Sequence, residues 1–280
     1  MVPDPTRAAM IALRYDRDYG YADHHLMAMM AAKGRDFGPL PVDLAAKGFE
    51  IARAFPAEHA REILSRLDPN EGIVRLLDDS FDFLRWALHP ACEGEIGSRL
   101  RALFRSEFSV TGIAFRRKIG GVSKASGKPG DAYEKSSAFW HCDGGPTTHV
   151  KVLIYLAEAS AHDGGTAYID RSTTELFKAA GYLFPASEDR TMDLHGDARK
   201  AGFDYRETLL KPECGEAIIF QPSTTLHRAR LPERGERVTM TLLCLPSAKS
   251  WAERIREEHR AVLDNHSCGF PPLQGRLQLS

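Results

Sequence analysis

Hydrophobic and polar positions in the first hundred or so residues follow mostly helical periodicity. Residues 21–33 are rich in Ala, Leu and Met, which are good helix formers. Residues 48–55 instead alternate apolar and polar side chains, which predicts a short strand with Phe49, Ile51 and Phe55 facing inward. Other helices are expected after an N-cap at Asp43, from a first turn containing Pro56, within 73–88 and around 96–108.

The pattern changes after residue 107 to short β-like runs separated by Gly or Pro. The runs are 110–119, 138–143, 149–158, 164–170, 205–212, 215–222, 224–231 and 237–246. Many short strands with turn signals favour a sandwich or barrel. Residues 120–135 and most of 171–203 are expected to be loops, with one helical turn at 174–180, and 251–263 is expected to be a charged helix.

The chain of 280 residues is long enough to bury a sizeable core. We expect a single domain over 1–280, with a mainly helical part at 1–107, a β core at 108–247, and a C-terminal helix and tail at 248–280. No run approaches the ~18 apolar residues of a membrane helix.

The formal net charge of −1 gives no reason to expect nucleic acid or an anionic membrane as a partner. Basic residues do gather at 116–118 and 228–237. Such clusters are usually solvated, but they could also meet an anionic small molecule. The five cysteines show no metal-ligand or redox spacing, so we expect reduced thiols in a cytoplasmic protein. The sequence does not indicate an oligomeric state.

A candidate metal site is formed by His141, Asp143 and His227. His141 and Asp143 are two positions apart in a β-like run, so their side chains would share one face. His227 lies on a late β-like run. Two imidazoles and one carboxylate suit iron(II) and leave coordination positions open for dioxygen and an organic co-substrate.

A second His-x-Asp sequence, His195 with Asp197, competes for this role. His141 precedes His227 by 86 residues, an interval that can hold the intervening strands of a jelly roll, whereas His195 precedes it by only 32. His195 and Asp197 also lie in a segment expected to be a solvated loop. We therefore prefer the first pair, although two unconnected histidines remain the alternative. His149 could line the same cavity or be a partly buried histidine.

Arg237 follows His227 by ten residues, across a turn signal at 231–236. A hairpin between the two runs would place Arg237 near His227, where its guanidinium could hold a carboxylate in a bidentate pair. Thr239 and Thr241 would share its face. The alternative is a surface arginine paired with Glu233 or Glu236. The remaining basic candidates are Arg228, Arg230 and Arg234, expected to point outward, and Arg117 and Lys151, which could contact an anionic substrate group or be exposed.

These residues together resemble the iron(II)/2-oxoglutarate-dependent dioxygenases, and most of all their phytanoyl-CoA dioxygenase-like branch. The matching segments are 48–51, 141–143, 164–169 and 215–220, together with His227 and Arg237, and they cover roughly residues 43–247. The resemblance implies a mainly β protein with a double-stranded β-helix (jelly-roll, cupin-like) core flanked by N-terminal helices. The stretch 171–174, Arg-Ser-Thr-Thr, departs from the usual Pro-Gly-Ser-His of that branch.

The resemblance also implies a function. Iron(II) would be bound by His141, Asp143 and His227, and 2-oxoglutarate would chelate it and pair with Arg237, with Tyr155 as a further contact. Thr239 is the other expected contact, because it shares the face of Arg237 and its hydroxyl could add a hydrogen bond. Dioxygen would then hydroxylate a small-molecule substrate, releasing succinate and CO2. Asp143 favours hydroxylation, since halogenating members lack the acidic ligand. The alternatives are a cupin-like isomerase, lyase or zinc hydrolase that does not use 2-oxoglutarate, and a non-catalytic jelly-roll binding module.

Overall fold

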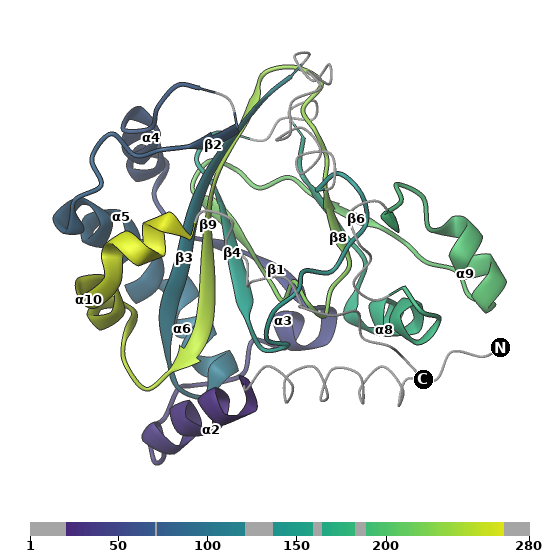
Figure 1. Cartoon of the computed structure of the whole chain (residues 1–280), viewed down its shortest axis with the longest axis horizontal. Coiled ribbons are helices and arrows are strands. Elements are labelled where there is room, and N and C mark those ends of the chain that lie inside the picture. The colour runs from purple at the N-terminus through teal and green to yellow at the C-terminus, as the bar shows by residue number, and fades with distance from the viewer. Residues whose placement is uncertain (1–20, 71, 121–136, 159–163, 183–188, 266–280) are drawn as a thin grey trace.

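Two antiparallel β-sheets face one another, and most of the helices cover the outer side of the larger sheet (Figure 1). The computed structural model describes residues 21–70, 72–120, 137–158, 164–182 and 189–265. The expected fold class, mainly β with helical additions around a jelly-roll core, is confirmed. None of the helices in the described part of the chain combines the length and apolar content needed to cross a membrane.

The larger sheet has six strands in the order β1-β7-β4-β9-β3-β2. Their bounds are β1 Phe49–Arg53, β2 Gly72–Val74, β3 Glu107–Ile119, β4 Val150–Tyr155, β7 Glu216–Phe220 and β9 Glu236–Ser247. The smaller sheet has the order β6-β5-β8, with β5 Thr166–Tyr168, β6 Thr208–Leu210 and β8 His227–Ala229. The long antiparallel pairing of β3 with β9 joins chain segments more than a hundred residues apart.

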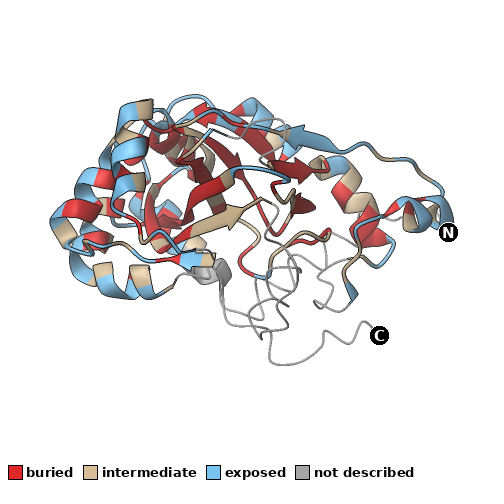
Figure 2. Cartoon of the chain, turned by 90° about the horizontal axis from the view of Figure 1, so that it is seen from above, coloured by how far each residue is buried: buried red, intermediate tan, exposed pale blue. Residues whose placement is uncertain are grey.

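The larger sheet has two chemically different faces. On β9, Val238, Met240 and Leu242 belong to the main hydrophobic core. The residues that alternate with them, Arg237, Thr239 and Thr241, line a cavity between the sheets. Because side chains alternate along a strand, one strand serves both the core and the cavity. Figure 2 shows the resulting buried strands between helices that are exposed on their outer sides.

The helices pack against the core face of the larger sheet or flank the smaller one. They are α2 Tyr21–Ala31, α3 Val42–Lys47, α4 Ala57–Ser65, α5 Phe81–Glu93, α6 Glu95–Phe104, α8 Arg171–Ala179, α9 His195–Ala201 and α10 Trp251–Asp264. The predicted C-terminal helix is confirmed as α10. It begins at a capping box in which Ser250 and Glu253 satisfy each other's backbone N–H groups, and it buries Trp251 and Ile255.

Several local predictions were wrong. Residue 73 lies in β2, and the helix expected there begins only at Phe81, after an N-cap at Ser80. Ile51 is 39% exposed because β1 is an edge strand, whereas Phe49 on the same strand is covered by Tyr168 of the smaller sheet. Asp43 lies in the first turn of α3.

Pro56 is the N-cap of α4 rather than part of its first turn. The expected loop at 120–135 falls almost wholly outside the described residues. The 171–203 segment contains two helices, α8 and α9, where one helical turn was expected.

Candidate metal centre

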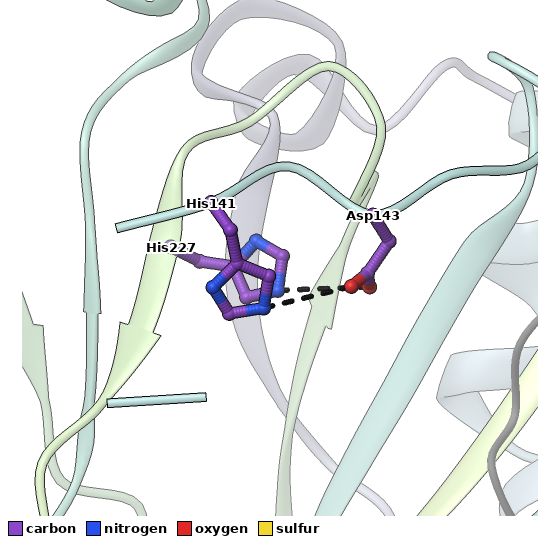
Figure 3. A group of neighbouring side chains, drawn as sticks. All are labelled: His141, Asp143 and His227. Atoms are coloured by element: carbon purple, nitrogen blue, oxygen red, sulfur yellow. Dashed lines mark ion pairs between the residues drawn. The ribbon is translucent and has the colours of Figure 1, made fainter. Parts of the chain in front are cut away.

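His141, Asp143 and His227 converge on one point between the two sheets. The Nε2 atom of His141 lies 3.6 Å from Oδ1 of Asp143, and Nε2 of His227 lies 3.6 Å from Oδ2 of Asp143. One candidate ligand atom from each residue lies within 4.8 Å of the others. Figure 3 shows both imidazoles directed at the carboxylate. Metal–ligand bonds of about 2.1 Å need adjacent ligand atoms about 3 Å apart, so small side-chain shifts would close this site on an ion.

The main chain brings the two histidines together. The N–H of His141 donates to the carbonyl of His227 (3.1 Å), and the N–H of His227 donates to the carbonyl of His141 (3.0 Å). This is an isolated bridge, so the prediction that 138–143 forms a strand was wrong. Asp143 is instead held by its N–H, which donates to the carbonyl of Pro222 (2.9 Å). The convergence predicted from strand parity therefore occurs through a bridge and a loop contact.

Each histidine is oriented by a carbonyl two residues before it. Nδ1 of His141 lies 2.7 Å from the Phe139 carbonyl oxygen, and Nδ1 of His227 lies 3.0 Å from that of Thr225. A carbonyl oxygen only accepts, so Nδ1 carries the proton in both rings. The Nε2 lone pairs therefore face the shared point, as metal ligation requires.

The electrostatics of the site keep these groups in their metal-binding protonation states. Burial, together with the neighbouring His227, lowers the pKa of His141 to about 3, and burial also lowers the pKa of His227. Burial alone would raise the pKa of Asp143, but the Lys151 ammonium group holds it below its ordinary value. The site thus presents neutral imidazoles and a charged carboxylate at neutral pH.

Lys151 of β4 is the neighbour of this carboxylate. Its Nζ lies 2.7 Å from Oδ2 of Asp143, and only 14% of its side chain is exposed. The sequence suggested Lys151 as a substrate contact or an exposed residue. The sequence shows no signal for its pairing with Asp143, because the two lie on segments whose approach depends on the fold.

Arg237 lies in the same cavity, of about 130 Å³, which His141, Asp143 and His227 also line. Its Nε donates to the Tyr155 hydroxyl (3.3 Å) and its Nη2 donates to the Thr166 hydroxyl (3.1 Å). The side chain is buried, and the guanidinium carbon lies 5.2 Å from the centre of the Tyr155 ring. The alternative prediction was a surface Arg237 paired with Glu233 or Glu236, but Glu236 pairs with Arg117 instead.

The hairpin expected between the His227 and Arg237 strands does not form. β8 belongs to the smaller sheet and pairs with β5, whereas β9 belongs to the larger sheet and pairs with β3 and β4. Arg237 and His227 therefore line one cavity from facing sheets. Local sequence could not reveal this, because β9 pairs with strands far away in the chain.

Thr239 lies next to Tyr155 across the β4–β9 ladder. It is fully buried and lines the cavity. Its Oγ1 has no hydrogen-bond partner among the described residues. A buried hydroxyl without a partner is costly, so this atom is a candidate contact for a ligand.

Thr166 is a cavity residue that the sequence did not single out. It follows Gly164, which has φ +74° and where a Cβ atom would come within 2.2 Å of the Arg230 carbonyl oxygen. The Gly-Gly pair before Thr166 is therefore the sequence feature that could have pointed to this residue, since only glycine permits this turn and close approach.

The remaining candidates lie elsewhere or have other partners. His195 is exposed at the start of α9, so the loop expected there was wrong, and it lies outside the group formed by His141, Asp143 and His227. His149 is buried beside Ser223 and does not line the cavity. Arg228, expected to point outward, is buried: it pairs with Glu207 (2.6 Å) and lies over the Trp140 ring.

Neither a protein-family model nor a curated protein matches this sequence. Solved structures do match its fold. One is the non-heme alpha ketoglutarate dependent carbocyclase SnoK from nogalamycin biosynthesis, with 10% identity, a TM-score of 0.50, and 72% of this chain and 80% of that chain covered. Another is HygX from Streptomyces hygroscopicus with iron bound, with 15% identity, a TM-score of 0.47, and coverage of 75% and 87%. At these identities the likeness concerns the fold, and the chain shares the jelly-roll architecture of SnoK.

Proposed function

We propose that this protein is a non-haem iron(II)- and 2-oxoglutarate-dependent dioxygenase that hydroxylates a C–H bond of a small molecule. One observation carries the proposal. The His141, Asp143 and His227 ligand atoms converge in the same cavity that contains the buried guanidinium of Arg237.

The three side chains fit iron(II). Two neutral imidazoles and one carboxylate form the donor set that non-haem iron oxygenases use, and it leaves positions for other ligands. Iron, when bound, supplies the redox chemistry of dioxygen activation, with 2-oxoglutarate as the reductant that becomes succinate and CO2. The chain's own residues orient the ligands: Phe139 and Thr225 fix the two imidazole tautomers through their carbonyls, and Lys151 keeps Asp143 charged.

The cavity around Arg237 fits the far carboxylate of 2-oxoglutarate. No Asp or Glu in the described part of the chain forms an ion pair with this buried guanidinium, and a buried charge without an opposite charge is unfavourable. A carboxylate can accept a bidentate pair from Arg237 and a further hydrogen bond from Thr239. Tyr155 and Thr166 hold the guanidinium in place through their hydroxyl groups.

Hydroxylation rests on Asp143, because an acidic ligand occupies the position that a halide takes in halogenating relatives of the proposed family. The fold by itself does not select this outcome, since SnoK is a carbocyclase. The phytanoyl-CoA dioxygenase-like branch remains a prediction from sequence.

The test begins with purified protein loaded with iron(II) under nitrogen, followed by calorimetric titration with 2-oxoglutarate. We expect one iron per chain, iron-dependent 2-oxoglutarate binding, and succinate formation on admitting air. An unaltered 2-oxoglutarate affinity in Arg237→Gln would count against the proposal, and iron binding without any 2-oxoglutarate binding would favour a cupin-like isomerase, lyase or hydrolase. Full iron retention by a His141→Ala, Asp143→Ala double variant would show that the metal site is misassigned, and absence of metal binding would favour a binding module.

A further inference from the structure

A second hollow in the surface lies between α4 and α5. It has a volume of about 470 Å³ and is lined by a set of residues that we call the Trp86 pocket: His59, Asp82, Arg85, Trp86, His89 and Pro90. Figure 1 shows both helices on the side of the larger sheet that faces away from the smaller sheet. None of these residues lines the cavity of the candidate metal centre. The proposed function therefore assigns the Trp86 pocket no role.

The spacing of residues along α5 explains why its outer side carries most of this pocket. Asp82, Arg85, Trp86 and His89 stand three, four and seven positions apart, which places them on one face of the helix. The opposite face of α5 belongs to the main hydrophobic core, to which it contributes Phe83, Leu84, Ala87 and Leu88. The pocket therefore forms on a helix whose position is fixed by its buried side.

Trp86 forms an aromatic wall of the pocket. The His59 ring lies against it, with ring centres 4.2 Å apart, and the Phe83 ring centre lies 5.4 Å away. His59 is itself held in place, because its Nε2 donates to the Ala87 carbonyl oxygen (3.2 Å) and its ring contacts Phe55. Trp86 nevertheless remains 37% exposed. This partly uncovered indole offers a firm packing surface for an apolar or aromatic group of a ligand.

The polar side chains around this wall are not engaged elsewhere. Asp82, Arg85 and His89 form no hydrogen bond, ion pair or ring contact with another residue in the described part of the chain. Asp82 and Arg85 are one turn apart, a spacing that permits an ion pair, yet they do not pair. On the neighbouring helix α6, by contrast, Arg99 and Arg101 pair with glutamates. The pocket thus presents a carboxylate, a guanidinium and an imidazole beside the indole.

The two charges of the pocket favour a ligand that carries both signs. An anion would be attracted by Arg85 but repelled by Asp82, and a cation would meet the reverse. A zwitterion can pair its ammonium group with Asp82 and its carboxylate with Arg85, whose guanidinium matches a carboxylate in a bidentate pair. An α-amino acid carries both groups on one carbon atom, so its side chain is left to pack against Trp86.

We propose that the Trp86 pocket binds a free α-amino acid with an aromatic or large aliphatic side chain. Asp82 accepts hydrogen bonds from the ammonium group, Arg85 donates to the carboxylate, and the Trp86 ring covers the side chain. This binding site goes beyond the proposed function and does not depend on it, because the pocket and the metal cavity have no lining residue in common.

The experiment titrates L-phenylalanine into the whole chain without metal, by calorimetry and by tryptophan fluorescence. Concentrations extend into the millimolar range, because exposed ion pairs are individually weak. Fluorescence reports on the pocket itself, since Trp140 and Trp251 are buried whereas Trp86 is partly exposed. Three further probes each lack one feature of the ligand: phenylpropionate lacks the ammonium group, phenylethylamine lacks the carboxylate, and L-alanine lacks the ring.

The test variants are Asp82→Asn and Arg85→Gln, each of which removes one charge from the pocket. Their matched controls are Glu62→Gln and Arg61→Gln, which remove the same charges from exposed positions of α4 that do not line the pocket. Arg237→Gln shows whether phenylalanine binds in the metal cavity instead. Circular dichroism establishes that each variant is folded.

We expect the wild-type protein, both α4 controls and Arg237→Gln to bind phenylalanine with equal affinity, with a change in tryptophan emission. The three other probes should bind the wild type about fivefold more weakly, as expected for the loss of one partly exposed contact. Asp82→Asn should no longer distinguish phenylalanine from phenylpropionate. Arg85→Gln should no longer distinguish phenylalanine from phenylethylamine.

Several results would overturn the amino-acid site. They are the absence of phenylalanine binding by the wild type, binding without a change in fluorescence, equal weakening in the α4 controls, and loss of binding in Arg237→Gln. Unchanged discrimination between the probes in either test variant would also overturn it. None of these measurements involves iron or 2-oxoglutarate, so their failure would leave the proposed function untouched.

Discussion

The ammonium group of Lys151 lies 2.7 Å from the carboxylate of Asp143, so a candidate metal ligand already has a cation beside it. Two opposing effects on metal affinity follow. The ammonium group keeps the carboxylate ionised, as its effect on the pKa of Asp143 shows. It also lies within about 5 Å of any ion bound to that carboxylate, given a metal–oxygen bond of about 2.1 Å.

The repulsion should dominate at neutral pH. A divalent ion and the ammonium group about 5 Å apart repel each other by several kcal/mol even at an effective dielectric constant of ~20. A hydrogen bond to a charged group contributes only ~1.5–3 kcal/mol. We expect Lys151→Met to bind zinc(II) or cobalt(II) at least tenfold more tightly at pH 7.5, by competition with a chelating indicator. Lys151→Arg, which retains the charge, should behave as wild type. Weaker binding by Lys151→Met would mean that orientation of Asp143 matters more than repulsion.

Removal of Arg237 should weaken 2-oxoglutarate binding without affecting the metal. Truncating one partner of a buried charge pair costs about 2–5 kcal/mol, and every 1.4 kcal/mol is a factor of ten in the dissociation constant. We expect Arg237→Gln to raise the 2-oxoglutarate Kd at least ~30-fold by anaerobic calorimetry. The Kd of iron(II) should stay within twofold of wild type, and Arg256→Gln should change neither constant.

Thr239→Val should preserve or raise the stability of the ligand-free protein but weaken 2-oxoglutarate binding. The substitution keeps the shape of the side chain and removes a buried hydroxyl that has no partner among the described residues. The free energy of unfolding without ligand should therefore stay constant or rise by about 1 kcal/mol in urea denaturation. The 2-oxoglutarate Kd should rise about tenfold, since a hydrogen bond to a carboxylate is lost. A destabilised variant with unchanged Kd would contradict a ligand contact at this hydroxyl.

The metal-free protein should lose stability as the pH falls below about 6.5. The pKa of His141 is lowered to about 3, and that of His227 is also lowered, so the unfolded chain takes up protons that the folded chain does not. The unfolding free energy then rises with pH between about 3 and 6.5 and levels off above it. Urea denaturation from pH 4.5 to 7.5 would measure the slope. His141→Asn should reduce it, and His195→Asn, on exposed α9, should not.

Asp143→Asn should bind metal poorly while remaining folded. The amide has nearly the same shape but no charge to balance the ion. Loss of an outer-shell partner alone typically costs 10–100-fold in affinity, so loss of a ligand should exceed about 100-fold. Metal content measured by mass spectrometry after dialysis would show this, with Asp197→Asn as the control. Full metal content in Asp143→Asn would remove this residue from the site.

Sequence could indicate the parts of the site that depend on the spacing of nearby residues or on the order of strands along the chain. His141 and Asp143 were found from their spacing, and His227 from the strands that must lie between. Strands β3, β4 and β9 could be predicted from sequence because their apolar runs are long. Residue 73, in a strand of only three residues, resembled the start of the following helix.

What sequence could not indicate was which strands face one another. Arg237 was placed near His227 by a hairpin that does not exist, because pairing with β3 depends on residues far earlier in the chain. The contact between Lys151 and Asp143, and the opening of Arg116 into the cavity, likewise arise from sheet register. Each local pattern fits several registers, and only tertiary packing selects one.

The alternation along β9 has a consequence for how such a protein can diversify. Exchanges at Arg237, Thr239 and Thr241 alter the cavity while the core-facing residues between them keep the helices in place. New specificities are therefore accessible to this lineage by point substitution at every second position. A single-residue insertion or deletion in β9 would instead turn valines and leucines into the cavity and bury arginine under the helices. Natural variation in this strand should consequently be rich in substitutions and nearly free of length changes.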